Sequence, residues 1–249
     1  MPLVTVVIPC YNGAKYLSKT MDSVIAQIFD DWEMIVVDDC SKDNSAAIVK
    51  EYLEKEPRIK YLCTSHNTGS PAIPRNMGME AAQGKYIALL DADDIWYPTK
   101  LQNQVDQLES NGYQIMYSNG DMIDENGKHL RPINKRKKSD YWSILMENEL
   151  SCSATIFRKD MVGDMRFKNM VKEDFVFWIE LMRTSKTTAF NTGTREYAYR
   201  IITDSRSRNK QNIIKQQWYV LRSVEKLNFF IASYCFFRWV IRNVKKYYM

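Results

Sequence analysis

The sequence of 249 residues contains only two histidines, His66 and His129. A metal site would therefore rely mainly on oxygen ligands, which favour Mg²⁺ or Mn²⁺. The five cysteines are odd in number, lie far apart and include no C-x-x-C pair. We therefore expect reduced thiols in a cytoplasmic protein, and neither a disulfide framework nor a zinc site.

Other signatures are missing as well. The first ten residues, MPLVTVVIPC, contain no basic n-region and no A-x-A cleavage site, so we expect no secretory signal. Gly13 is a lone turn glycine outside any G-x-G-x-x-G motif, which argues against a dinucleotide oxidoreductase. A net charge of +5 is too small and too dispersed to indicate nucleic-acid binding. With 45% hydrophobic residues, the chain is too apolar to be disordered or fibrous.

What the sequence does contain is an alternation of apolar strands and amphipathic helices. The run LVTVVI at residues 3–8 is continuous and rich in β-branched residues, as expected of a strand buried on both faces. Strands and helices then alternate over roughly 100 residues, which predicts an α/β fold with a parallel sheet covered on both faces. The expected helices are 15–27, 45–55 and 72–83, and the further expected strands are 33–37, 59–63 and 85–90.

The pattern changes after residue 112. One α/β domain is expected over residues 1–205, with a first half at 1–111 and a second half at 112–205, followed by a helical tail at 206–249. In the second half, the sequence predicts strands at 112–118, 154–158 and 196–201, helices at 140–147 and 172–184, and a hairpin turn at Asn126-Gly127.

Polar side chains gather where three of the predicted strands end. These ends are residues 9–13, the pair Asp38-Asp39 and the segment 91–94, which reads DADD. Because ligands bind beyond the carboxyl ends of parallel strands, five carboxylates would come to one rim. Like charges this close need a counter-charge. A divalent cation shared with a substrate phosphate would supply it.

Four segments together resemble glycosyltransferase family 2, which has the GT-A nucleotide-sugar fold. They are VVIPCYNGAKYL, VVDDCSKDNS, NTGSPAIPRNMGMEAAQGKYIALLDADD and KEDFVFWIEL, in the order and spacing of the family. The resemblance covers residues 1–205 and is to transferases of the bacterial surface-polysaccharide type. It implies an inverting hexosyltransferase that uses a nucleotide-diphosphate sugar, UDP-linked, with Mg²⁺ or Mn²⁺. The implied acceptor is a glycan or a lipid-linked glycan.

The resemblance also implies which residues bind the donor nucleotide. Pro9 and Tyr11 would line the uracil pocket, and Asp39 would accept a hydrogen bond from the base. Arg75, in the PRN segment, would face the diphosphate or the base. Cysteine stands at position 40, where the family usually has glycine, and this departure touches the base contact.

The same resemblance assigns the D-x-D element to Asp91-Ala92-Asp93, with Asp91 near the ribose and Asp93 on the metal. Asp174, in the Glu173-Asp174 pair, would be the catalytic base. From the residues alone, Asp174 could equally be a carboxylate that interacts with the dipole at a helix start.

Two rival functions remain open at this point. The apolar strand followed by D-x-D-x-Ile resembles the nucleophile motif of haloacid-dehalogenase phosphohydrolases, although that motif normally opens the chain. A non-catalytic sugar-nucleotide sensor would keep Asp39 and Asp93 without needing Asp174. The sugar, the acceptor, the linkage and the oligomeric state are left open by the sequence.

Three basic or aromatic segments each have two interpretations. The run 131–138, RPINKRKK, is either a solvated loop or a contact for phosphate or anionic lipid. Segment 199–210, with Arg200, Arg206, Arg208 and Lys210, is either a lid over the diphosphate or an exposed loop. In the tail, aromatic residues alternate with Lys and Arg, which favours a helix at the inner membrane surface over packing on the domain or on a second copy. Its apolar run FFIASYCFF is too short to span a bilayer.

Overall fold

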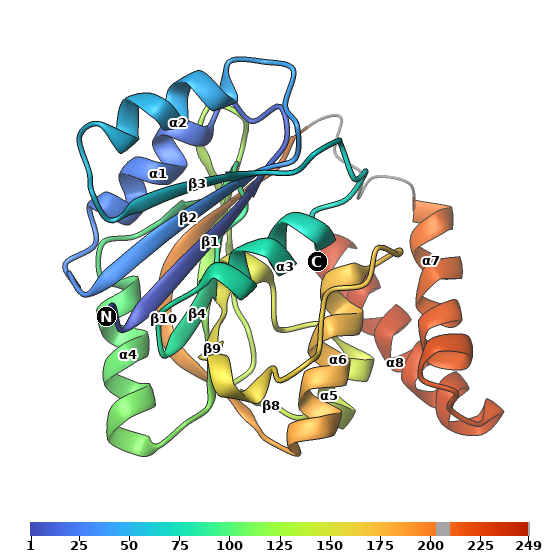
Figure 1. Cartoon of the computed structure of the whole chain (residues 1–249). Coiled ribbons are helices and arrows are strands. Elements are labelled where there is room, and N and C mark those ends of the chain that lie inside the picture. Colours follow the sequence, from blue (N-terminus) through green and yellow to red (C-terminus); the bar gives the residue numbers. More distant parts are fainter. Residues whose placement is uncertain (203–209, 249) are drawn as a thin grey trace.

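The computed structural model describes residues 1–202 and 210–248, with side chains for all of these except 210–212 and 243–248. Within these residues, ten strands form one mixed sheet (Figure 1). The strands are β1 (Val4–Cys10), β2 (Trp32–Asp38), β3 (Ile59–Cys63), β4 (Tyr86–Leu89), β5 (Ile95–Trp96), β6 (Ile115–Ile123), β7 (His129–Ile133), β8 (Lys138–Ser139), β9 (Ile156–Arg158) and β10 (Ala189–Arg200).

Helices cover both faces of this sheet. The α-helices are α1 (Leu17–Ile25), α2 (Ser45–Leu53), α3 (Ala72–Ala81), α4 (Lys100–Asn111), α5 (Tyr141–Met146), α6 (Glu173–Ser185), α7 (Lys210–Tyr219) and α8 (Phe229–Tyr248). Two short 3₁₀ turns, η1 (Cys152–Ala154) and η2 (Lys159–Met161), flank β9, and a π-helical turn, η4 (Val220–Val224), continues α7.

The strand order is β3-β2-β1-β4-β9-β6-β10-β5, with β7 beside β6 and β8 beside β10. The first four strands are parallel, as the sequence predicts. The second half departs from that pattern, because β9 runs antiparallel between β4 and β6. Strand β10 pairs parallel with β6 and antiparallel with β5. The α/β expectation is confirmed, with a parallel first half and a mixed second half.

Several boundaries differ from those expected. Strand β10 begins at residue 189 rather than 196, and helix α4 is absent from the expectations. The early part of β10 contains exposed polar residues and a register shift after Asn191, so it lacks the apolar run of a buried strand. The hairpin at Asn126-Gly127 is confirmed: the backbone N–H of Asp124 donates to the carbonyl of Lys128, and β6 and β7 pair antiparallel.

The sheet separates two hydrophobic cores. Val4, Val6 and Ile8 of β1 face a core shared with α1, α2 and α4. Val7 points the opposite way, into a core shared with α3, α5 and α6, as the alternation of a strand requires. Gly78 lets α3 approach β1, because a Cβ at this position would lie 2.3 Å from a methyl group of Val7.

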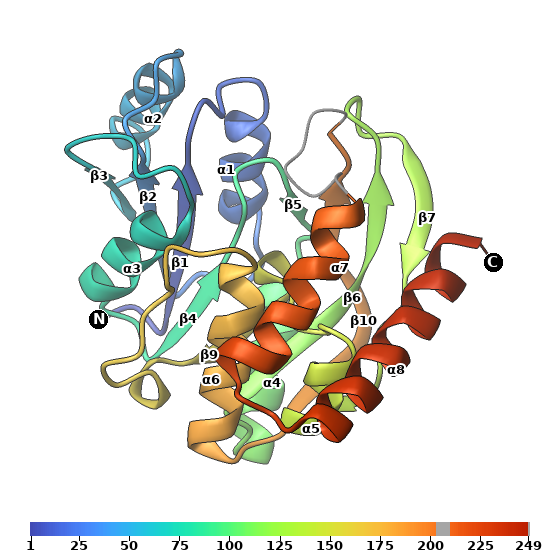
Figure 2. The same cartoon turned by 90° about the vertical axis from the view of Figure 1, so that its right-hand side faces the viewer.

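The tail packs on the second of these cores with its inner face. Val220, Leu221, Ala232 and Cys235 are all buried there. In Figure 2, α7 runs across the front of α6, and α8 lies beside α5. Packing on the domain, one of the alternatives for the tail, is therefore found for this inner face. No helix among the described residues is both long and apolar enough to cross a lipid bilayer.

Candidate active site

The segment after β4 carries three carboxylates with different surroundings. Asp94 is 1% exposed and accepts hydrogen bonds from the Ser153 hydroxyl and from the backbone N–H of Arg200. Asp91 is engaged in a salt bridge with a buried arginine. Asp93 forms no ion pair with a described residue, and burial, together with the charge of Asp91, raises the pKa of its carboxyl to about 6. Of the three, only Asp91 is paired with a cation. Asp94 is held by hydrogen bonds, and Asp93 is influenced by the charge of Arg200, which favours its ionised form, without forming an ion pair with a described residue.

This arrangement bears on whether a metal ion could bind. Among the described residues, no three Asp, Glu, His or Cys side chains form a complete metal site. Mg²⁺, however, is often bound by one or two carboxylates together with the phosphates of a substrate. The Asp93 carboxylate, which forms no ion pair with a described residue, fits a divalent cation that is held jointly by the protein and a diphosphate.

Arg75 connects this segment to a distant part of the chain. It lies on α3, is only 4% exposed, and donates from Nη2 to Asp91 at 2.7 Å. Its Nη1 donates to Oε1 of Glu173, the first residue of α6, at 3.0 Å. A buried charge is tolerated only when it is paired in this way. The guanidinium thus fastens the D-x-D segment to the start of α6.

Asp174 is the second residue of α6 and is partly exposed. Burial and then the neighbouring charge of Glu173 raise the pKa of its carboxyl to about 6. The side-chain amide of Asn148 lies 3.5 Å from Oδ2. A carboxyl whose pKa lies close to neutral pH can accept a proton during a reaction and release it afterwards.

The start of α6 is also held from the tail. Lys172 precedes the helix in a left-handed conformation, with φ of 55°. Its ammonium group donates to Gln217 of α7 at 2.6 Å and lies 4.9 Å from the ring centroid of Trp239 on α8. Burial lowers the pKa of Lys172 to about 8. The backbone that presents Asp174 is therefore fixed by contacts with both tail helices.

The residues expected in the nucleotide pocket lie at the ends of β1 and β2. Pro9 is buried in β1, and Tyr11 just beyond it is 40% exposed. Asp39 is 3% exposed and accepts hydrogen bonds from the Thr64 hydroxyl and from both the backbone N–H and the hydroxyl of Thr68. The sheet thus brings Pro9, Tyr11 and Asp39 to the same edge.

The cysteine at position 40 has a backbone conformation that explains the glycine expected there. Its φ is 60°, in the left-handed region that glycine adopts without steric cost. The turn is stabilised by Asp38, which accepts from the backbone N–H of Ser41 at 2.9 Å and from the Tyr61 hydroxyl at 2.8 Å. Cys40 therefore adopts the left-handed conformation that the turn requires, and the hydrogen bonds of Asp38 hold the turn in place.

Arg200 lies in neither of the two environments that the sequence suggests for segment 199–210. It is 2% exposed at the end of β10, so it belongs to neither a lid nor an exposed loop. Its Nε donates to the carbonyl of Asp93 at 2.8 Å, and Nη1 donates to the carbonyls of Asp124 and Glu125. Arg200 fixes the backbone of the D-x-D segment. Arg206, Arg208 and the side chain of Lys210 lie outside the described residues.

Some contacts of the site could not be anticipated from local sequence. The Ser153 hydroxyl donates to Asp94, and its oxygen accepts from the backbone N–H of Asp91 at 3.2 Å. Ala92 is held by its carbonyl, which accepts from the Thr20 hydroxyl at 2.9 Å. Neither Ser153 nor Thr20 belongs to a recognisable motif, and each is separated from its partner by more than 50 residues.

Known proteins are similar to this chain over most of its length. The sequence profile described as glycosyl transferase family 2 matches residues 5–172. WfgD of Escherichia coli, named as a UDP-Glc:alpha-D-GlcNAc-diphosphoundecaprenol beta-1,3-glucosyltransferase, is 31% identical over 248 residues, which cover 98% of this chain and 95% of WfgD.

Solved structures agree in fold. TarS of S. aureus, in a complex with UDP-GlcNAc, superposes with a TM-score of 0.73 at 18% identity, covering 98% of this chain and 73% of TarS. The mannosyltransferase PcManGT of Pyrobaculum calidifontis, in a complex with GDP-Man and Mn²⁺, gives a TM-score of 0.66 at 18% identity, over 90% of this chain and 64% of PcManGT.

These matches decide between the functions that the sequence left open. The family match and the WfgD match each extend over most of the chain, and both are to glycosyltransferases. They favour a transferase over the phosphohydrolase and over the non-catalytic sensor. The chain belongs to glycosyl transferase family 2 and is a glycosyltransferase with the GT-A fold.

Proposed function

We propose that this enzyme transfers a hexose from a UDP-sugar, with inversion at the anomeric carbon, to a lipid-linked glycan during surface-polysaccharide synthesis at the cytoplasmic face of the membrane. The observation that carries the proposal is the pair of salt bridges from Arg75 to Asp91 and Glu173. They place the D-x-D segment and the residue next to Asp174 on opposite sides of one guanidinium. The name of WfgD, with its UDP-Glc donor and diphosphoundecaprenol acceptor, supports the substrate classes.

On the donor side, Pro9, Tyr11 and Asp39 would hold the uracil, with Asp39 accepting a hydrogen bond from the base. Asp91 would lie near the ribose, and Ala92 would contact the donor through its backbone. Asp93 would hold Mg²⁺ or Mn²⁺ together with the diphosphate. When bound, that cation supplies positive charge to the leaving UDP.

On the acceptor side, Asp174 would act as the general base. The acceptor hydroxyl oxygen forms a bond to the anomeric carbon while the bond from that carbon to the β-phosphate oxygen breaks. The electron pair leaves with UDP, and the hydroxyl proton passes to the Asp174 carboxylate. One displacement on the face opposite the leaving group inverts the configuration.

The experiment is the kinetics of Asp174→Asn. The amide preserves size and a polar group at the helix start but cannot take up the proton. We expect kcat to fall about 10²–10⁴-fold with the donor KM nearly unchanged, because the base acts only in the transition state. The wild-type kcat/KM should rise with pH with an apparent pKa of about 6, that of the Asp174 carboxyl in the unliganded chain.

Asn148→Ala is the matched control, because Asn148 touches the same carboxylate without taking a proton. It should lower kcat much less than Asp174→Asn. A product with retained configuration, or near-normal turnover by Asp174→Asn, would remove Asp174 from this role.

A further inference from the structure

One face of α8 exposes large apolar side chains that no described residue covers. Phe230 is 83% exposed, Tyr234 59%, Phe237 64% and Ile241 52%. Their spacing of four, three and four residues places them on one stripe of the helix. The opposite stripe contains the buried residues Ala232 and Cys235. This helix is therefore apolar on the inside, against the core, and also on the outside.

The exposed stripe continues onto α5. Trp142 of α5 is 51% exposed. A hollow between the two helices is lined only by Trp142, Met146, Phe230, Ile231, Tyr234 and Cys235. We refer to the stripe together with Trp142 as the outer face. A contiguous apolar surface of this kind marks a site of interaction rather than ordinary exposed surface.

Positive charges are in excess around the outer face. The sequence of α8 contains no Asp or Glu, but it contains Arg238, Arg242, Lys245 and Lys246. Arg222 and Lys226, just before α8, and Lys137 and Lys138, just before α5, are exposed.

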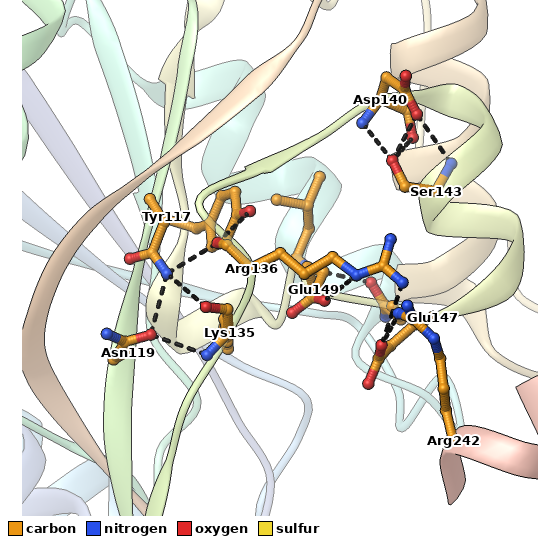
Figure 3. A network of polar contacts seen from close by, with 12 residues as sticks. Tyr117, Asn119, Lys135, Arg136, Asp140, Ser143, Glu147, Glu149 and Arg242 are labelled. Atoms are coloured by element: carbon orange, nitrogen blue, oxygen red, sulfur yellow. Dashed lines mark hydrogen bonds and ion pairs between the residues drawn. The ribbon is translucent and has the colours of Figure 1, made fainter.

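The nearby acidic groups are already engaged. Asp140 caps α5 by accepting from the backbone N–H of Ser143. Glu147 lies between Arg136 and Arg242, as Figure 3 shows. The outer face therefore combines apolar side chains with an excess of positive charge.

We propose that the outer face docks on an anionic lipid bilayer, with α8 lying in the plane of the interface. Helices with aromatic residues on one side and Lys and Arg at the margins bind in this way. Trp and Tyr are the side chains that favour the boundary between lipid and water. A symmetric dimer through the same face would set the basic residues of one copy against those of the other, which disfavours a second copy as the occupant.

The inner face of α8 relates this docking to catalysis. Trp239 lies on Lys172, two residues before Asp174, and Arg242 pairs with Glu147, next to Asn148. A bilayer on the outer face would thus lie on the Asp174 side of the molecule, where an acceptor carried by a lipid would arrive. This orientation rests on the proposed function, whereas the docking itself does not.

The experiment is flotation of the full chain with vesicles of phosphatidylcholine alone and of phosphatidylcholine with phosphatidylglycerol. The full chain should float with the anionic vesicles, and more weakly at high salt. Phe230→Ser/Phe237→Ser should lose most of this binding, because each phenyl ring contributes about tenfold or more when it leaves water. Arg238→Gln should weaken it about fivefold. Ile28→Ser is the control, since Ile28 is 58% exposed on the other side of the sheet.

Substitutions of exposed residues are preferable to deleting α8, because a deletion would also uncover the core around Ala232 and Cys235. UDP binding is measured in parallel and should be equal in all variants. Absence of flotation by the wild type, or equal flotation by Phe230→Ser/Phe237→Ser, overturns the docking proposal. A wild-type dimer in light scattering that this double variant dissociates also overturns it, in favour of a second copy. Failure of the wild type to bind UDP would instead contradict the proposed function.

Discussion

Arg75 and Asp91 form a buried salt bridge of 2.7 Å between α3 and the D-x-D segment. The same guanidinium also pairs with Glu173 at 3.0 Å, so two carboxylates from distant parts of the chain share one counter-charge. Removing that charge leaves both carboxylates facing one another without compensation.

We therefore expect Arg75→Met to lower the free energy of unfolding by about 3–5 kcal/mol, the usual cost of breaking a buried pair. Urea denaturation measures this change. Arg75→Lys should recover only part of it, because one ammonium group does not reproduce the fixed spacing of Nη1 and Nη2, which contact Glu173 and Asp91. Equal stability of Arg75→Met and the wild type would show that these contacts contribute nothing.

Asp93 and Asp94 are neighbours in the chain, but alanine at each position should affect a different property of the protein. Asp93→Ala should not destabilise the unliganded protein, and it should stabilise it above about pH 6, because burial and the charge of Asp91 penalise the ionised carboxylate. It should abolish the rise in melting temperature that UDP and Mn²⁺ together produce in the wild type.

Asp94→Ala is the comparison. It should lower the free energy of unfolding by about 1–3 kcal/mol, because the Ser153 hydroxyl and the Arg200 N–H lose a buried acceptor. A full UDP shift in Asp93→Ala, or in wild type treated with EDTA, would contradict the role of Asp93 in holding a metal.

The raised pKa of Asp174 predicts a pH dependence of stability. Its carboxyl has a pKa of about 6 in the folded chain against an ordinary value of 3.8. Between these values the folded state binds more protons than the unfolded state, so this group lowers stability as pH rises from about 4 to 6.

Asp174→Asn removes that cost. The variant should be up to about 3 kcal/mol more stable than the wild type at pH 8, with the difference disappearing near pH 4. Urea denaturation at both pH values measures it. Asp164→Asn, at an exposed carboxylate, serves as the control and should show no such pH-dependent gain. A variant no more stable than the wild type at pH 8 would mean that burial does not penalise the Asp174 carboxylate.

Because α3 lies so close to β1, a larger side chain at position 78 should be tolerated only when the side chain at position 7 is smaller. Gly78→Ala should cost about 1–3 kcal/mol, because its Cβ would lie 2.3 Å from a methyl of Val7. Val7→Ala in the same chain should restore much of that loss, so the two substitutions should be strongly non-additive. Additive effects in thermal unfolding would show that α3 simply moves away from the sheet.

The sequence predicts best the elements that are uniform along their length. Strands β1, β2 and β4 are buried along their whole length, so each has a long apolar run that a pattern can identify. Strand β5 has two residues and exists only because Trp96 and Ile95 pair with Tyr197 and Ala198. No local pattern marks such a strand, and the same holds for the exposed start of β10.

The site residues likewise fall into two groups, those that a motif identifies and those that only the fold brings together. The motifs place Asp91, Asp93 and Asp174 in the sequence, and the fold brings Asp91 and the residue beside Asp174 onto one arginine. What Arg75 contacts, and what Arg200 holds, depends on contacts between residues far apart in the chain. The sequence predicts that Arg75 faces the diphosphate or base, whereas its described contacts are carboxylates.

The contacts of Arg200 with the D-x-D segment form only late in the synthesis of the chain. Asp94 leaves the ribosome about a hundred residues before Arg200, whose N–H groups hold the D-x-D segment in place. At about 5–20 residues per second, this delay lasts roughly five to twenty seconds. Throughout that interval the nascent chain carries the D-x-D carboxylates without the strand that fixes them. A message truncated before codon 200 would therefore yield a chain that contains the D-x-D segment but lacks the Arg200 contacts that hold its backbone.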